Sequence, residues 1–182
     1  LSWLEGERKK LQTGARQVVE TDRVREMASE SFAQLWQRLG YDPGHRPFVI
    51  VIQHPIISEA EQAGELMLLT LESLVSLDLP AFISYPNSDA GSQKIIEVIE
   101  TYTQRCPALF HKYQNLPRLE FINLMRRAHA LVGNSSCGII EAPLFHLPVV
   151  NIGPRQRGRE HADNVQFVDH DPVHGHSRRH GQ

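Results

Sequence analysis

Short apolar runs and longer amphipathic segments alternate along this chain. The run Phe-Val-Ile-Val-Ile at 48–52 contains no polar residue, which is typical of a strand buried on both faces of a parallel sheet. In the segment 92–104 the isoleucine and valine residues instead fall on one side of a helix. This alternation predicts that helices and strands follow one another from about residue 23 onward.

The spacing of apolar residues gives the bounds of each predicted element. The predicted strands are 48–52, 80–85, 108–112, 129–132 and 148–152. The predicted helices are 23–39, 58–77, 92–104, a segment that opens at Pro117, and 139–145. Ser58 and Ser92 stand at predicted helix starts, where a serine side chain commonly caps free backbone N–H groups. The order predicts an α/β fold, with a Rossmann-like parallel sheet covered by helices on both faces.

The chain divides into three parts by pattern. Residues 1–45 are predicted to be an N-terminal helical segment, and residues 46–168 carry the alternating pattern of one Rossmann-like domain. Residues 169–182 are rich in histidine and hold almost no core-forming residues, so we expect a disordered tail. Adventitious metal binding is the alternative interpretation of that tail.

The composition narrows the class of protein. The 182 residues are 41% hydrophobic and 22% charged, with a formal net charge of −2, so no basic field attracts nucleic acid. No apolar run reaches the roughly 20 residues that a membrane-spanning helix needs, and the N-terminus lacks a signal-peptide layout. The two cysteines, Cys106 and Cys137, indicate neither a disulfide framework nor a zinc cluster. We therefore expect a cytoplasmic protein with free thiols and no bound metal or cofactor.

The segment 133–143 carries the most specific chemical signal. Here Gly-Asn-Ser-Ser-Cys-Gly follows a predicted strand and leads into a predicted helix. Ser135 and Ser136 would place two hydroxyls beside free backbone N–H groups, which predicts a phosphate site; a tight packing turn is the alternative. Glu141 follows within reach of a sugar hydroxyl, although a surface glutamate is the simpler interpretation. Cys137 stands where a helix N-terminus lowers a thiol pKa, but we interpret it as a packing residue.

Other polar residues follow the remaining strands. His54 follows 48–52, Asn87 lies in the loop after 80–85, and Arg155 lies in a basic loop after 148–152. The carboxyl ends of parallel strands meet at one edge of a sheet, so we expect these side chains to meet the serine turn there. His54 could donate to a phosphate oxygen as an imidazolium or as a neutral ring. Each residue also has a simpler interpretation. His54 could bond a loop carbonyl, Asn87 could serve only the turn, and Arg155 could be solvated.

These motifs resemble those of one enzyme family. His54-Pro55, the loop 85–92, the turn 133–141 and the segment 151–159 are together similar to UDP-N-acetylglucosamine 2-epimerases, in the same order over residues 46–168. The resemblance is strongest to the hydrolysing branch, which serves sialic-acid and related sugar pathways. The non-hydrolysing branch carries a Thr-Asp-Ser-Gly-Gly turn in place of this serine turn, so it fits less well.

The resemblance implies a fold and a set of binding residues. It implies two Rossmann-like domains with the active site between them, similar to the glycosyltransferase-B (GT-B) architecture, and this chain would hold the C-terminal, UDP-binding domain. The implied ligand is UDP or UDP-N-acetylglucosamine. By motif, Ser135 and Ser136 would bind the diphosphate, and His54 would bind the phosphate region. Glu141 would accept the ribose hydroxyls, and Asn87 and Arg155 would line the same site. Leu116 and Phe121 would form an apolar wall beside the uracil.

The resemblance also implies a reaction. In the family a base removes the proton at sugar C2 while UDP leaves from C1, and the 2-acetamidoglucal is then hydrated to N-acetylmannosamine. We expect His54 to be the catalytic residue of this chain. Together with Ser135, Ser136 and Arg155, it would stabilise the departing UDP. The family's acid and base carboxylates lie mainly in the N-terminal domain, so we expect this chain to be incomplete for catalysis.

Several alternatives remain open on the sequence. After the epimerase half, the second hypothesis is a non-catalytic nucleotide-sugar-binding module, and the third is the donor domain of a glycosyltransferase. The expected partners are UDP or UDP-N-acetylglucosamine and either a second copy of the chain or an N-terminal Rossmann-like domain. Nucleic acid and membrane are not expected partners.

Overall fold

The computed structural model describes residues 32–169, which form a six-stranded parallel sheet in the order β3-β2-β1-β4-β5-β6. This is the strand order of the Rossmann fold, so the predicted fold class is confirmed. Residues 23–31 of the first predicted helix and 170–182 of the predicted tail lie outside the described residues. No helix within 32–169 is long and apolar enough to span a bilayer.

Six short strands and five α-helices make up the described part. The strands are β1 Val49–Ile52, β2 Ala81–Ser84, β3 Phe110–Tyr113, β4 Ala130–Gly133, β5 Val149–Ile152 and β6 Val165–Val168. The α-helices are α2 Phe32–Leu39, α3 Ala63–Ser76, α4 Ser92–Arg105, α5 Arg118–Arg127 and α6 Cys137–Ile140, and the 3₁₀ helices are η1 Ile57–Gln62 and η2 Ala142–Phe145. The five predicted strands are present with small shifts at their ends, and β6 is an additional edge strand.

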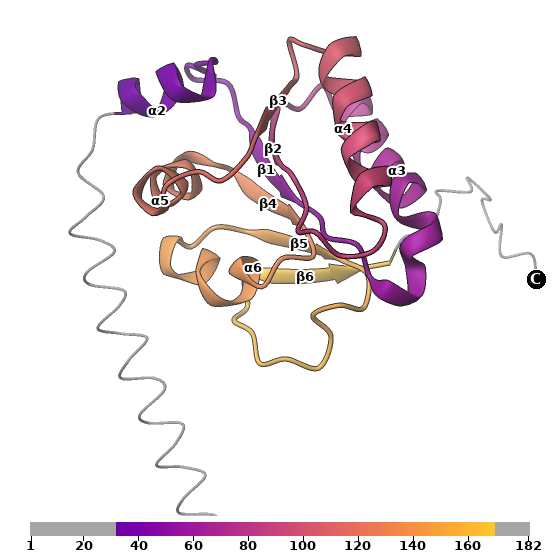
Figure 1. Cartoon of the computed structure of the whole chain (residues 1–182). Helices are drawn as coiled ribbons and strands as arrows, with labels where there is room; N and C mark the ends of the chain where they lie inside the picture. The colour runs from indigo at the N-terminus through magenta and orange to yellow at the C-terminus, as the bar shows by residue number, and fades with distance from the viewer. Residues whose placement is uncertain (1–31, 170–182) are drawn as a thin grey trace, which may run out of the picture.

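Helices cover the sheet on both sides, with α3 and α4 on one face and α2, α5 and α6 on the other (Figure 1). Alternate residues of β1 point to opposite faces. Ile50 and Ile52 join the core cluster that includes residues of α2 and α5. Val49 and Val51 join the cluster of α3 and α4. A strand with two buried faces needs apolar residues at every position, which explains the continuous run at 48–52.

Aromatic packing attaches α2 to the sheet. The ring of Trp36 stacks on Phe82 with 5.7 Å between centroids, and it meets Phe48 edge-on at 5.9 Å. Phe48 and Phe82 are themselves T-shaped at 5.1 Å, and both are buried. Such ring pairs stabilise a core beyond the apolar area that they bury, so the helix is fixed by side chains and not by its own length.

Both predicted serine N-caps are wrong. Ser58 lies inside η1, whose N-cap residue is Ile56 and has no side-chain cap bond. The N-cap residue of α4 is Gly91, with φ +94°, and Ser92 is already helical. A Cβ at Gly91 would lie 2.9 Å from the carbonyl oxygen of Ala60. The start of α4 approaches η1 so closely that this position requires glycine.

The predicted helix 139–145 is also interrupted. The structure has one α-helical turn, α6, followed by the 3₁₀ helix η2. Pro143 lies at the start of η2 and has no N–H group to continue an α-helical ladder. With a single turn, α6 provides much less of a helix dipole than the sequence suggested.

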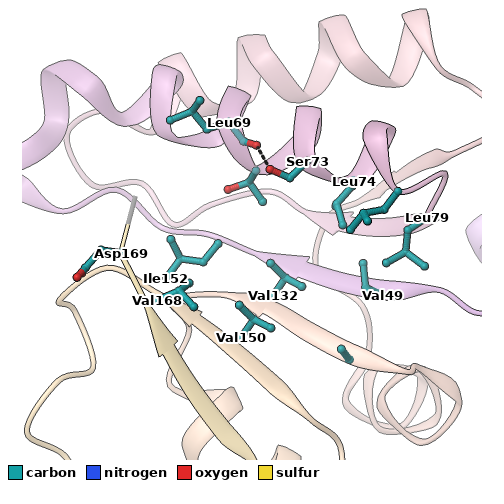
Figure 2. A pocket seen from close by; sticks show the side chains of 13 residues that line it. Val49, Leu69, Ser73, Leu74, Leu79, Val132, Val150, Ile152, Val168 and Asp169 are labelled. Atoms are coloured by element: carbon teal, nitrogen blue, oxygen red, sulfur yellow. Dashed lines mark hydrogen bonds between the residues drawn. The ribbon is translucent and has the colours of Figure 1, made fainter. Parts of the chain in front are cut away.

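An apolar groove of about 350 Å³ lies on the α3 side of the sheet, between that helix and β4, β5 and β6 (Figure 2). Helix side chains face the valines of the strands across it, and none of the predicted site residues lines it. Among the residues that line the groove, Leu77 is 69% exposed. The residues that line it are Val49, Leu69, Thr70, Ser73, Leu74, Leu77, Leu79, Ala130, Val132, Val150, Ile152, Val168 and Asp169.

Candidate functional site

The side chain of Asn134 joins the carboxyl ends of β1 and β4. The backbone N–H of His54 donates to Asn134 Oδ1 at 2.7 Å, and Asn134 Nδ2 donates to the His54 carbonyl oxygen at 2.8 Å. Asn134 is 2% exposed, and an amide that is buried this fully has to be hydrogen-bonded. The pair of bonds therefore fixes the loop after β1 against the turn after β4.

Gly133 makes this contact possible. Its φ is +133°, and a Cβ at this position would lie 2.0 Å from the carbonyl oxygen of Ile52. The next residue, Asn134, donates its backbone N–H to that same oxygen at 3.0 Å. Only glycine allows the two strand ends to approach so closely, which gives the first glycine of the motif a structural role.

The loop after β2 reaches the same place through the ring of His54. The backbone N–H of Asn87 donates to His54 Nδ1 at 3.1 Å. Because Nδ1 accepts this bond, the neutral ring carries its proton on Nε2. Burial, followed by the positive charge of Arg155, lowers the pKa of His54, and the negative charge of Asp89 opposes them. The geometry thus favours a neutral N–H donor over an imidazolium at pH 7.

The loop after β5 closes the arrangement. Arg155 Nη1 donates to the carbonyl oxygen of Asn134 at 3.3 Å, and Gln156 Nε2 donates to the same oxygen at 2.9 Å. Gln156 is buried and accepts a bond from Arg159 at 2.8 Å, whereas Arg155 is exposed. The buried amide of Gln156 therefore anchors the loop, while Arg155 stays exposed. The edge of the sheet where the carboxyl ends of the strands meet is called the rim below.

Asn134 and Gln156 are the residues that sequence reasoning missed. Both lie inside motifs that the sequence singled out, and each is next to a predicted site residue. For Asn134 the available signal was an amide directly after an apolar strand, since such a group is buried only where it has partners. Gln156 stands between two arginines, and nothing local marks it as buried. The predicted residues His54, Asn87 and Arg155 are brought together, and Asn134 is the residue through which they meet.

The serine turn lies directly after this contact. Neither Ser135 nor Ser136 donates its backbone N–H to a backbone carbonyl within residues 32–169. The Ser135 hydroxyl lies 3.2 Å from Cys137 Sγ, and both serines are half-buried. The turn therefore offers N–H and hydroxyl donors at the rim, which suits an anion.

Cys137 behaves as a packing residue. It is buried, and burial raises the pKa of its thiol to about 11. The prediction that a helix N-terminus would lower this pKa is wrong, because burial outweighs what one helical turn can contribute. The interpretation of Cys137 as a small core residue agrees with its place in the cluster beneath α5.

Glu141 lies at the end of α6 and is already paired. Its Oε2 forms an ion pair with Nη1 of Arg118, the first residue of α5. This pair could not be predicted from local spacing, because the two residues come from different elements. Leu116 and Phe121 flank Arg118 along the chain, and both are half-buried against the core cluster that includes Cys137. The predicted ribose residue is thus tied to the start of α5, the segment that also carries the two predicted uracil residues.

Two groups of residues therefore flank the serine turn. One is the clamp of His54, Asn87 and Arg155 around Asn134, and the other is the ion pair of Glu141 with Arg118 at the start of α5. Among the described residues, no group of three or more histidine, cysteine or acidic side chains is arranged to hold a metal ion. The donors of this rim suit an elongated ligand with a charged part and a neutral polar part.

Comparisons with known proteins agree on one family. The sequence profile described as UDP-N-acetylglucosamine 2-epimerase matches residues 5–174. The UDP-N,N'-diacetylbacillosamine 2-epimerase (hydrolyzing) of Legionella pneumophila subsp. pneumophila is 37% identical over 133 residues, which are 73% of this chain and 34% of that protein. The GDP/UDP-N,N'-diacetylbacillosamine 2-epimerase (hydrolyzing) of Campylobacter jejuni subsp. jejuni is 31% identical over 117 residues, 64% of this chain and 30% of that protein.

A solved structure shows the same fold. The UDP-GlcNAc 2-epimerase from Methanocaldococcus jannaschii matches with a TM-score of 0.56 at 12% identity, over 76% of this chain and 39% of that one. The chain spans about a third of the length of the curated relatives that it matches.

Proposed function

This chain belongs to the UDP-N-acetylglucosamine 2-epimerase family, and from that membership we propose that it is the UDP-binding half of a hydrolysing 2-epimerase. The observation that carries the proposal is the clamp in which His54, Asn87 and Arg155 meet around Asn134 beside the serine turn. The substrate is a UDP-linked 2-acetamido sugar. UDP-N-acetylglucosamine is the first candidate, and the diacetylbacillosamine nucleotides named for the two relatives are the next.

The rim would stabilise the departing UDP. The neutral ring of His54 offers an Nε2–H donor, Arg155 offers a guanidinium, and Ser135 and Ser136 offer hydroxyl and backbone N–H groups. Negative charge develops on the diphosphate as the sugar C1–O bond breaks. Donors that are held in place before the reaction stabilise that charge without having to reorganise. His54 and Arg155 therefore act on the leaving group in this proposal.

The remaining residues would hold the uridine. Glu141 accepts ribose hydroxyls, and the half-buried side chains of Leu116 and Phe121 provide an apolar wall for the flat base.

Catalysis requires groups beyond this rim. Two carboxylates near the rim are already engaged, since Asp89 Oδ2 accepts a bond from Asn87 Nδ2 at 2.5 Å and Glu141 is paired with Arg118. A third, Glu59, lines a small cavity together with His54 and Asn134. A base for the C2 proton and an acid for the hydration step would come from a second Rossmann-like domain. The full reaction, which forms N-acetylmannosamine and UDP from UDP-N-acetylglucosamine, is thus a property of the assembled protein.

Calorimetric titration with UDP tests the binding site. The Ser136→Ala variant is expected to bind UDP more weakly by about 1–3 kcal/mol, because it loses a hydrogen bond to a charged group. Ser76→Ala, which changes an exposed serine at the end of α3, is the matched control and should bind as the unaltered chain does. An unchanged affinity of Ser136→Ala would contradict the phosphate assignment.

The engaged carboxylates also favour a second candidate, a nucleotide-sugar-binding module without chemistry of its own. An assay for released UDP and N-acetylmannosamine, with and without an added N-terminal Rossmann-like domain, separates the two functions. Release of both products only when the second domain is present supports the epimerase half. UDP binding without product release in either case supports the module, and sugar transfer to an acceptor supports a glycosyltransferase donor domain.

A further inference from the structure

We propose that Arg118 and Glu141 act together to recognise the vicinal hydroxyls of the ribose, which makes Arg118 a specificity-determining residue of the UDP site. The inference rests on the proposed function. The observation behind it is the ion pair between Arg118 Nη1 and Glu141 Oε2, which joins the first residue of α5 to the residue after α6.

The position of the pair suits the ribose. Ser136 and Glu141 are the N-cap and C-cap residues of α6, so the single turn of that helix, a rise of about 5.4 Å, separates them. That span is comparable to the one between the phosphate and the ribose hydroxyls of a nucleotide. Arg118 follows Leu116 by two residues and precedes Phe121 by three, so it also borders the proposed uracil wall. The ion pair therefore joins the end of α6, which follows the serine turn, to the segment that carries the proposed uracil wall.

The chemistry of the pair matches a vicinal diol. A carboxylate only accepts hydrogen bonds, whereas a guanidinium carries five N–H groups and only donates. The ion pair uses Oε2 and Nη1, and within residues 32–169 no other hydrogen bond engages Glu141 Oε1 or the remaining N–H groups of Arg118. One ribose hydroxyl donates to the carboxylate while the oxygen of its neighbour accepts from the guanidinium. A 2′-deoxyribose can satisfy only one of the two residues.

The pair also holds Glu141 in position before the ligand arrives. The side chain of Glu141 is 21% exposed and that of Arg118 is 47% exposed, so the carboxylate is the more enclosed partner. Without the guanidinium, an enclosed carboxylate gains hydration by turning outward, away from the ribose. Arg118 thus adds to the site both a direct donor and the orientation of the acceptor.

Calorimetric titrations with UDP, 2′-deoxy-UDP and pyrophosphate test the inference on the full chain. Arg118→Met is expected to weaken UDP binding by about 5–20-fold, the range of one charge-assisted hydrogen bond, with a smaller effect on 2′-deoxy-UDP and none on pyrophosphate. The preference of the unaltered chain for UDP over 2′-deoxy-UDP should therefore shrink. Arg118→Lys, which keeps the charge and some donors, should restore part of it.

Arg46→Met is the matched control. Arg46 forms an ion pair with Asp78 at 2.6 Å and is 38% exposed, but it lies in the loop before β1, away from the rim. This variant should keep the full preference for UDP.

Three results would overturn the role of Arg118: a UDP preference unchanged in Arg118→Met, an equal loss for all three ligands, or no preference in the unaltered chain. If the unaltered chain binds neither UDP nor pyrophosphate, the proposed function itself fails and this inference falls with it.

Discussion

Asn134 shows at the scale of single residues how a buried amide can organise a site. Its side chain bonds both backbone groups of His54, and its carbonyl oxygen accepts from Arg155 and Gln156. Breaking such a set leaves several buried polar groups without partners, which costs more than the bonds contribute when they are made. The neutral state of His54 follows from this environment, because burial and the nearby Arg155 both disfavour a second positive charge.

The unfolding free energy is expected to decrease as the pH falls below 6.5. Burial lowers the pKa of His54 and of His111 below the ordinary histidine value, with the charge of Arg155 adding to the effect at His54. The unfolded chain therefore binds protons at these histidines before the folded chain does, and stability is lost as the pH falls. Urea unfolding between about pH 7.5 and 5.5 measures this slope.

The His54→Asn, His111→Asn double variant should flatten the slope. Asparagine at position 54 keeps an acceptor for the N–H of Asn87 and removes the titrating ring. The single His54→Asn variant separates the two contributions. Equal slopes for the unaltered chain and the double variant would contradict the assignment of the pH dependence to these two histidines.

At the scale of elements, α6 is held by close contact with the sheet. It has only one turn, so its stability comes from packing and not from its own hydrogen bonds. Gly138 is buried, and a Cβ there would lie 2.9 Å from Val149 Cγ1 and 3.4 Å from Leu131 Cδ2. The second glycine of the motif therefore allows α6 to lie directly on β4 and β5, which places the serine turn at the rim.

Gly138→Ala is expected to lower the unfolding free energy by about 1–3 kcal/mol, because the added methyl group overlaps Val149. Val149→Ala alone should also destabilise, since it removes buried methyl groups. The double variant should lose less than the sum of the two, because the smaller side chain makes room for the added methyl. Urea unfolding of the three variants measures the coupling, and simple additivity would contradict the contact.

The elements were predictable to different degrees. Strand β1 was evident because every residue of 48–52 is apolar. Strand β6, at Val165–Val168, was missed although its residues Val-Gln-Phe-Val favour a strand, because it is a short, half-exposed edge strand outside the alternating pattern. The predicted helix 58–77 starts as 3₁₀ helix because η1 contains a non-helical residue, Glu59. Local patterns thus identified buried elements better than edges and helix starts.

For the whole molecule, the two faces of the sheet differ in how completely they are covered. Helices α3 and α4 lie over β1, β2 and β3, and the described residues leave the apolar groove over β4, β5 and β6 (Figures 1 and 2). An apolar surface of this kind favours association with any apolar molecule of suitable size. The groove is separate from the rim, so the two surfaces can be altered independently.

The groove is expected to bind an environment-sensitive hydrophobic dye, with a rise in fluorescence. Leu77→Ser combined with Val150→Thr should reduce that rise, because both changes make the lining more polar. Ile57→Ser is the matched control, since Ile57 is 79% exposed and lies outside the groove. Equal losses in the groove variant and the control would contradict the groove as the dye site. UDP binding should be unchanged in the groove variant.

The sequence by itself determined the alternation of strands and helices, the parallel sheet and the polar residues at its strand ends, because hydrophobic spacing and turn residues act between near neighbours. Only the tertiary structure decided that Asn134 joins β1 to β4, that His54 keeps its proton on Nε2, and that Arg118 pairs with Glu141. The contacts of Asn134 and Arg118 join residues 80 and 23 positions apart. Such contacts depend on which strands and helices become neighbours in space, and local spacing does not encode that.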